Sequence, residues 1–228
     1  CLNPTVSTTV GDVERLPYPI AENSRKTTVM DLAATCVHIK KHLCEFSLIE
    51  KNYRQSPIIC GLETNVSAIK YFNYENNLLA QILINEAIIN EKIFEIYNLT
   101  EHDKAMVLAK EGESIGSLPV LAEAREAYLI ENSKLIIDNE GKAFPLGDHV
   151  ISYINDLPVR EFSAEQMEKI VRGFPTLYQS NNDLESFCTK HQINPINVWY
   201  WFRESGVNPQ QRQRTLALEF LADLIRQI

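Results

Sequence analysis

The residue types that bind metals best gather in one short stretch, at Cys36, His38, His42 and Cys44. Thiolates and imidazoles are the usual ligands of zinc. On a helix, however, a two-residue step turns the side chain by about 200°. Cys36 and His38 therefore point apart, and only His38 and His42 can share a face. We predict no metal site here: the small thiols are expected to be buried and the two histidines to face solvent.

An aromatic run is the second candidate, because Trp199, Tyr200, Trp201 and Phe202 follow one another directly. On a helix, four successive side chains cover more than half of the circumference, so at least two of them must be buried. We expect Trp199, Trp201 and Phe202 to fill the core between the last helices. The alternative is a stacking or docking surface for a nucleic acid or a partner protein. Its polar companions would be the nearby arginines Arg203, Arg212, Arg214 and Arg226.

The sequence carries no catalytic motif that we can identify. Its eight glycines are dispersed, without a G-x-G-x-x-G or P-loop pattern. A G-x-S-x-G elbow and an H-E-x-x-H pair are also missing. Adjacent side chains point apart in His102 and Asp103 and in Asp148 and His149, which favours polar surface positions. We therefore expect no catalytic residue and no cofactor-binding residue in this chain.

Composition indicates a cytoplasmic globular protein. Apolar residues make up 45% of the chain and charged residues 23%, close to the average for such proteins. No run approaches 18 apolar residues, so we expect no contact with a membrane. The five cysteines are odd in number and scattered, which is typical of a reducing compartment. The sequence lacks an initiator Met and a signal peptide, and its last helix has no cap, so we expect a piece of a longer protein.

The charge is unevenly distributed. The net charge is −8, yet residues 1–54 hold seven of the 22 basic and only six of the 30 acidic residues. A nucleic-acid-binding protein normally presents a basic face. Only this first quarter is close to neutral, so most of the chain is not expected to grip a phosphate backbone.

Hydrophobic periodicity predicts a mainly α fold with a minor β component, built from a long helix or helical hairpin and a C-terminal helical bundle. Residues 64–98 give the strongest signal, with apolar side chains at steps of three, four or seven and no Gly or Pro. Such a helix would extend about 50 Å at 1.5 Å per residue. Gln81 and Asn85 lie beside the apolar stripe and would weaken a long coiled coil, which favours the hairpin.

Cap chemistry places the shorter helices. Thr100 and Ser163 are expected N-caps, and Asn194 and Asn208 each precede a proline that suits the first helical position. Gly206 is expected to end the helix that begins after Asn194. Further helices are predicted over residues 25–49, 120–131 and 180–191.

The β component is expected in two places. Alternation predicts a short strand over residues 6–10, and residues 134–160 have β character, mainly at 135–137 and 149–154. We divide the chain into four segments: 1–62, 63–131, 132–162 and 163–228.

Three stretches resemble segments of one family. Residues 2–17, Leu-Asn-Pro-Thr-Val-Ser-Thr-Thr-Val-Gly-Asp-Val-Glu-Arg-Leu-Pro, resemble the end of the target-recognition region in PglX-type adenine-specific DNA methyltransferases of BREX phage-defence systems. Related type IIG restriction–modification enzymes have similar endings. Residues 89–99 are similar to the end of the long helix that follows there, with Asn98 in place of the usual Gly. Residues 194–202 and 217–225 are similar to a C-terminal helical segment of that family.

The resemblance implies a parent protein that methylates adenine in duplex DNA with S-adenosylmethionine. An adenine methyltransferase needs a Gly-rich turn for its cofactor and an Asn/Asp-Pro-Pro-aromatic loop for the flipped base. Neither occurs in this chain, whose Asn-Pro pairs lack the second proline and the aromatic. The four segments would then be the end of the target-recognition region with a first helix, a helical spacer, a β-rich connection and a C-terminal helical subdomain.

The expected role is therefore support of DNA recognition and scaffolding between lobes, without catalysis. The basic residues near the recognition end are the candidates for DNA contact: Arg15, Arg25 and Lys26. The expected partners are the rest of the methyltransferase, duplex DNA through that parent, and other phage-defence proteins. Two alternatives stay open, a protein–protein docking module of a defence complex and an unrelated enzyme with an unrecognised active site.

Overall fold

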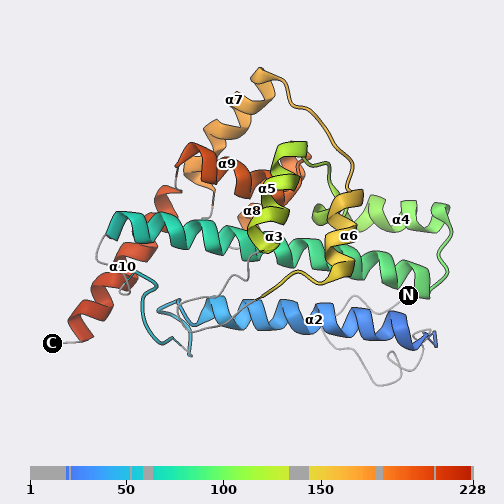
Figure 1. The fold of residues 1–228 in the computed structure, drawn as a ribbon, viewed down its shortest axis with the longest axis horizontal. Helices are drawn as coiled ribbons and strands as arrows, with labels where there is room; N and C mark the ends of the chain where they lie inside the picture. The colour runs from blue at the N-terminus through green and yellow to red at the C-terminus, as the bar shows by residue number, and fades with distance from the viewer. Residues whose placement is uncertain are drawn as a thin grey trace.

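The computed structural model describes residues 19–20, 22–51, 53–58, 64–133, 144–177, 182–207 and 209–226. Within them the fold is all-α (Figure 1). The α-helices are α2 (Asn23–Cys44), α3 (Thr64–Ile96), α4 (Glu101–Glu111), α5 (Ala122–Ser133), α6 (Asp148–Asp156), α7 (Ala164–Gly173), α8 (Asn182–His191), α9 (Pro195–Ser205) and α10 (Gln210–Arg226). Two short 3₁₀ helices join them, η1 (Ile115–Ser117) and η2 (Phe174–Thr176).

The predicted β component is wrong where the structure can test it. Residues 149–154 lie in α6, and β pairing among the described residues is limited to one isolated bridge between Val120 and Val159. Val150 and Ile154 are four residues apart, so they share one helical face, and both are buried. The β-branched residues therefore fill a helical face rather than a strand. The strands expected at 6–10 and 135–137 lie outside the described residues.

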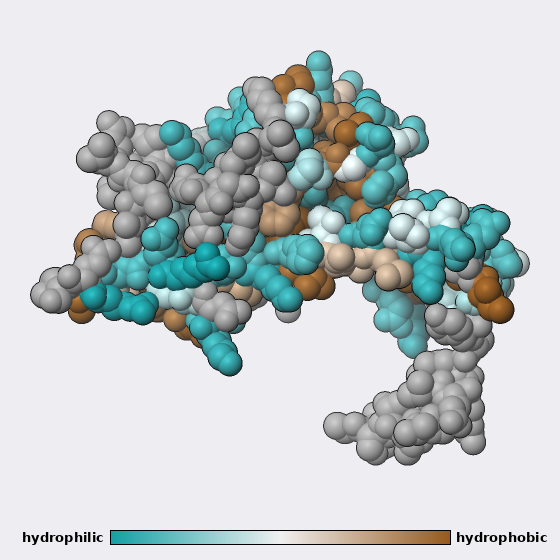
Figure 2. All heavy atoms as spheres, turned by 60° about the horizontal axis from the view of Figure 1, so that its bottom comes forward, coloured by the Kyte–Doolittle hydropathy of each residue, from teal (hydrophilic) through white to brown (hydrophobic). Residues whose placement is uncertain are grey.

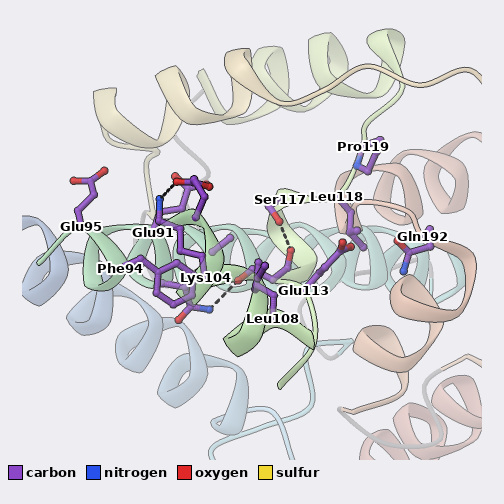
Figure 3. A pocket seen from close by; sticks show the side chains of 15 residues that line it. Glu91, Phe94, Glu95, Lys104, Leu108, Glu113, Ser117, Leu118, Pro119 and Gln192 are labelled. Carbon is purple, nitrogen blue, oxygen red and sulfur yellow. Dashed lines mark hydrogen bonds and ion pairs between the residues drawn. The ribbon is translucent and has the colours of Figure 1, made fainter. Parts of the chain in front are cut away.

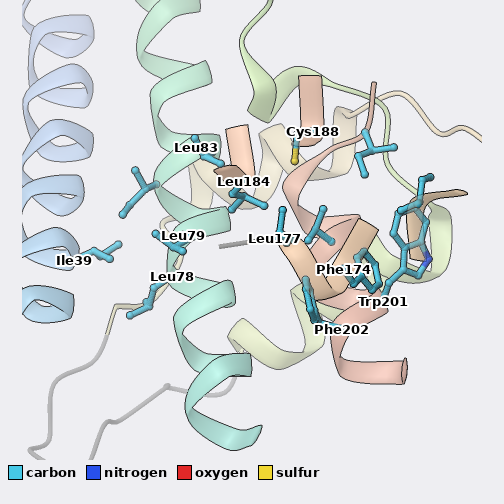
Figure 4. Close-up of a cluster of buried hydrophobic side chains, with 14 residues drawn as sticks. Ile39, Leu78, Leu79, Leu83, Phe174, Leu177, Leu184, Cys188, Trp201 and Phe202 are labelled. Atoms are coloured by element: carbon cyan, nitrogen blue, oxygen red, sulfur yellow. The ribbon is translucent and has the colours of Figure 1, made fainter. Parts of the chain in front are cut away.

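The long helix is confirmed as a single element. α3 runs for 33 residues without a break, and α2 packs antiparallel along it (Figure 1). One hydrophobic cluster joins α3 to α2 and to the C-terminal helices, through residues such as Ile39, Leu79, Phe174 and Phe202 (Figure 4). A second cluster joins it to α5, α6 and α9. α3 is thus the central element against which distant segments pack.

Three predicted caps form as the sequence indicates. Thr100 and Ser163 each make a complete capping box with the third helical residue, Asp103 and Gln166. The Asn194 side chain accepts a hydrogen bond from the Ile196 amide at 3.0 Å. Each of these bonds lies within four residues of sequence, so it depends on the local sequence alone.

Asn194 also does more than cap a helix. Its Nδ2 donates to the carbonyl oxygens of Gly116 and Leu118 at 2.8 and 2.9 Å. Asn197, one turn later, accepts from the Leu121 amide at 2.8 Å through Oδ1. Both asparagines are fully buried. They fix the segment after η1 against the start of α9.

Gly116 brings η1 into contact with α3. A Cβ at this position would overlap the backbone of Leu83 and Ile84. Only glycine therefore allows this close approach, which places the chain after α4 directly on the long helix.

A polar network holds α10 to the start of α3. Arg212 donates to both carboxylate oxygens of Glu75, through Nε at 3.0 Å and Nη2 at 2.7 Å. Its Nη1 lies 3.8 Å from Oε2 of Glu219. Glu219 also accepts from the Leu48 amide, and Asp223 accepts from the Ser56 amide. Buried carboxylates therefore outnumber the one buried arginine in this network.

A line of buried amides lies along α3. Asn77, Gln81 and Asn85 are each exposed by 2% or less. Among the described residues, neither amide atom of Asn77 has a hydrogen-bond partner, and neither does the carbonyl oxygen of Gln81. Buried polar atoms without partners cost about 1–3 kcal/mol each.

We expect Asn77→Leu to raise the free energy of unfolding by about 1–2 kcal/mol, because leucine has a similar branched shape and no unpaired polar atoms. Urea denaturation would measure this change. Asn73→Leu is the matched control at a half-exposed position of the same helix, where we expect a change within about 0.5 kcal/mol. A loss of stability in the Asn77 variant would mean that its amide has a partner in solution.

Candidate functional site

The residues expected to contact DNA are not gathered into a basic surface. Arg15 lies outside the described residues. Arg25 and Lys26 occupy the first turn of α2, and Lys26 is exposed. The Nε of Arg25 lies 3.8 Å from Oε2 of Glu22 and 3.9 Å from Oε2 of Glu95. Two carboxylates therefore accompany the arginine, which weakens its attraction for phosphate.

The aromatic run lies in the core. Trp199, Trp201 and Phe202 are exposed by 2%, 5% and 3%. Trp199 packs edge-on against Tyr128, and Phe202 stacks on Phe174 with ring centroids 4.5 Å apart. Figure 4 shows Trp201 and Phe202 pointing into the cluster around Phe174. These rings have no free face on which a nucleic-acid base could stack.

The prediction for the histidine pair is half wrong. His38 is exposed, but His42 is only 2% exposed and its Nε2 lies 2.9 Å from the Tyr74 hydroxyl. His42 lies on the face of α2 that packs against α3. It is buried because of this position on the helix, although imidazole is polar. Cys36 and Cys44 are half-buried, and burial raises the pKa of both thiols. In the described parts of the chain, no group of three or more His, Cys, Asp or Glu is placed to hold a metal ion.

A groove lies between α3 and α4. Its volume is about 680 Å³, and 15 residues line it (Figure 3). The C-terminal half of α3 forms one wall, α4 the other, and the segment from Glu113 to Pro119 closes one end. Its apolar lining is contributed by Ala87, Phe94, Ala105, Leu108, Leu118 and Pro119.

α4, which forms one wall of the groove, has no buried residue. Ala105 and Leu108 lie on the face toward the groove, and Met106 and Val107 are exposed on other faces. The capping box at Thr100 stabilises the helix locally. α4 is therefore a formed helix that is not packed into a core.

The groove is acidic. Four carboxylates and one ammonium line it, which gives a formal charge of −3: Glu91, Glu95, Glu101, Glu113 and Lys104. Lys104 is paired with Glu101 at 2.6 Å, and Glu95 is paired with Lys92 at 2.9 Å. In the described structure, Glu91 and Glu113 have no ion pair.

The pKa of Glu91 is raised above its ordinary value. Partial burial raises its pKa, and Glu95 adds to this effect. The hydroxyl of Tyr153 and the cations of Lys92 and Lys104 act in the opposite direction without cancelling it. An exposed carboxylate with a raised pKa is stabilised when a cation approaches it.

A second, smaller depression has the opposite character. It measures about 370 Å³ and lies between α7, η2 and α8. Lys169, Lys190 and His191 line it together with the hydroxyls of Thr176 and Ser186. Burial and the neighbouring Lys190 lower the pKa of His191, which keeps its ring neutral near pH 7. Lys169 is paired with Glu165 at 2.8 Å. Glu165 thus neutralises the charge of one of the two lysines, Lys169. The depression is open to solvent.

The remaining surface is mixed. On the face shown in Figure 2, hydrophilic side chains predominate and apolar ones emerge in small groups. A larger set lies on one side of α10, where apolar residues follow one another at steps of three and four and are 41–64% exposed: Leu218, Leu221, Leu224 and Ile225. Every helix among the described residues is too short or too polar to cross a membrane.

Comparison of the chain with protein-family models, with curated proteins and with solved structures finds no match.

The groove was not predicted from the sequence. Its lining comes from residues 87–119 and from Gln192, and their meeting depends on how far α4 stands from α3. One local signal did exist: Glu101, Lys104, Ala105 and Leu108 repeat at helical spacing. That pattern predicts one face of α4, but it does not predict that α3 forms the opposite wall of a groove.

Proposed function

We propose that this chain is a non-catalytic helical scaffold within a PglX-type adenine-specific DNA methyltransferase of a phage-defence system. There it holds the DNA-recognition lobe at a fixed separation from the catalytic lobe. The upstream part of the parent would bind S-adenosylmethionine and methylate adenine in the cytoplasm. Duplex DNA, the other lobes and further defence proteins are the proposed partners.

The long helix α3 is the observation that supports this proposal. Its 33 residues extend about 50 Å at 1.5 Å per residue. Hydrophobic clusters that include α2, α5, α6 and α9 pack along it, so it cannot bend without disturbing the core. A helix packed along its length is suited to fix the distance between two lobes.

The apolar side of α10 also supports a scaffold. Leu218, Leu221 and Ile225 are more than half exposed, although each is a large apolar side chain. Contiguous exposed apolar residues usually mark a contact with another protein surface. Another part of the parent would cover this side.

The link to the methyltransferase family rests on the three similar stretches of sequence. Residues 89–99 cover the end of α3 and the turn after it, and residues 194–202 and 217–225 lie in α9 and α10. The open reading frame gives the direct test. An Asn-Pro-Pro-aromatic motif and a Gly-rich turn should be encoded upstream of Cys1, and a complete gene without them would contradict the proposal.

DNA binding gives a second test. We expect the 228-residue chain to bind duplex DNA weakly and without sequence preference, with a Kd in the range of about 10⁻⁴–10⁻⁶ M that is typical of non-specific binding. Fluorescence anisotropy with labelled duplexes of unrelated sequence, at several salt concentrations, measures this. Tight binding to one sequence would show that the chain is itself the recognition domain.

A protein–protein docking module is the second candidate function. The acidic groove between α3 and α4 favours it, because anionic walls repel DNA and attract cationic protein surfaces. Co-purification with other proteins of the same defence system, lost when the groove is filled, would distinguish docking from scaffolding.

A further inference from the structure

The groove between α3 and α4 has the dimensions and lining of a binding cleft. Its volume of about 680 Å³ falls within the range of about 300–1,000 Å³ seen for ligand pockets. Phe94 and Leu108 form an apolar floor, and Leu118 and Pro119 bound it at one end. Such a lining favours apolar side chains, whose burial is worth about 25 cal/mol per Å².

The charges of the groove select among possible ligands. Glu91 and Glu113 lack an ion pair within the described structure, whereas Glu95 and Glu101 are matched by lysines. Either of these two carboxylates can therefore form an ion pair with a cationic ligand, although Tyr153, Lys92 and Lys104 already interact with Glu91. A phosphate backbone or an anionic membrane surface would be repelled.

From this we infer that the groove between α3 and α4 binds a segment of a partner protein that carries lysine or arginine beside apolar side chains. The apolar groups of the segment rest on Phe94 and Leu108, and its cations pair with Glu91 and Glu113. Such a segment would bind whether or not the chain belongs to a methyltransferase.

A turn with positive φ bounds α4 at each end. Asn98 precedes the helix with φ 48° and Gly112 follows it with φ 91°. Because both residues are already in the left-handed region, they form turns at which the helix direction changes. α4 has no buried residue, so a shift of this wall exposes little core.

Binding should depend on pH through Glu91. Lys92 and Glu95 on α3, Lys104 on α4 and Tyr153 on α6 are the charged and titratable groups that face it. Burial raises the pKa of Glu91, and a bound cation lowers it. Binding therefore releases a proton and becomes tighter as the pH rises through the raised pKa of Glu91.

The experiment uses a fluorescein-labelled amphipathic peptide of lysine and leucine as the probe and the 228-residue chain as the receptor, with anisotropy as the readout. We expect the double variant Glu91→Gln/Glu113→Gln to weaken binding about tenfold. Glu123→Gln/Glu126→Gln is the matched control, because it makes the same charge change on exposed positions of α5. We expect less than a twofold effect from this control. Circular dichroism checks that both variants are folded.

A second pair of variants tests the place of binding. Ala105→Arg fills the groove, and Met106→Arg adds the same charge to the same helix on a side that does not line it. Both positions are exposed, so neither change should unfold the protein. Ala105→Arg should weaken peptide binding more than tenfold and Met106→Arg about twofold or less. The other results would overturn the inference: no binding of the peptide, equal loss in the two members of either pair, or competition by duplex DNA for the same groove.

Discussion

Replacing Arg212 with methionine is expected to lower the free energy of unfolding by about 3 kcal/mol, near the lower end of the range for breaking a buried ion pair. The Arg212 side chain is only 17% exposed, and Glu75 and Glu219 beside it are 12% and 4% exposed. Methionine keeps most of the buried aliphatic length but leaves these carboxylates without a cation. Urea denaturation of wild type and variant measures the difference.

Arg214→Met is the matched control for this prediction, because Arg214 is exposed on the same helix. We expect a change within about 0.5 kcal/mol there. A loss of equal size in both variants would mean that Arg212 stabilises α10 through helix propensity rather than through its ion pair.

The pH dependence gives an independent check on the same network. Burial raises the pKa of Glu219 above its ordinary value of 4.5, and Arg212 opposes this shift. Without Arg212, the pKa of Glu219 rises further. A carboxyl with a raised folded-state pKa stabilises the fold in acid, and this contribution is lost as the pH rises through that pKa. The cost of Arg212→Met should therefore be larger at pH 7 than near pH 4.5, and Glu219→Gln should reduce the difference.

Trp199→Ala is expected to lower the free energy of unfolding by about 3–5 kcal/mol, as is usual when a buried aromatic residue is truncated. The indole is 2% exposed, packs edge-on against Tyr128 with ring centroids 5.2 Å apart, and has the Arg203 guanidinium over its face at 5.3 Å. Alanine would leave a cavity between α5 and α9. Thermal and urea denaturation measure the loss.

Two further variants separate the causes of this loss. Trp199→Phe keeps an aromatic ring in the core and should recover more than half of the stability. Arg203→Ala removes the cation over the ring together with its exposed ion pairs with Glu131 and Glu204, and should cost less than about 1 kcal/mol. If Trp199→Ala changed the stability by only a few tenths of a kcal/mol, the aromatic run would be a contact surface instead of a core.

Much of the helical architecture was predictable because its causes are local. The 64–98 stretch forms α3 within two residues at its C-terminal end, since apolar periodicity without Gly or Pro continues to Ile96. The caps at Thr100, Ser163 and Asn194 and the left-handed Gly206 depend only on neighbouring residues. These local signals do not depend on how the rest of the chain folds.

Other features depend on long-range contacts that no local pattern contains. Arg212 meets Glu75 across 137 residues, and Asn194 meets Gly116 across 78. Residues 149–154 suggested a strand because β-branched residues are common there, but the contacts of Val150 and Ile154 with α3 and α5 favour a helix. The polar residue His42 is buried for the same reason: its environment is set by Tyr74 and Phe144.

The candidate site was the least predictable part. Glu91 and Glu113 look like ordinary surface carboxylates in the sequence, and only the position of α4 places them around one groove. The metal-like and aromatic residues attracted attention by their type, whereas the groove is made of common residues. Its character comes from their shared location and net charge.

The lack of buried residues in α4 has a consequence for how this protein would respond to a ligand. Opening or closing that helix changes little of the apolar area that stabilises the native state, so the free energy of local motion is nearly independent of the global free energy of unfolding. Ligands of different width could then be accommodated at a small energetic cost. The affinity of the groove for a ligand and the thermostability of the packed helices could in this way evolve separately.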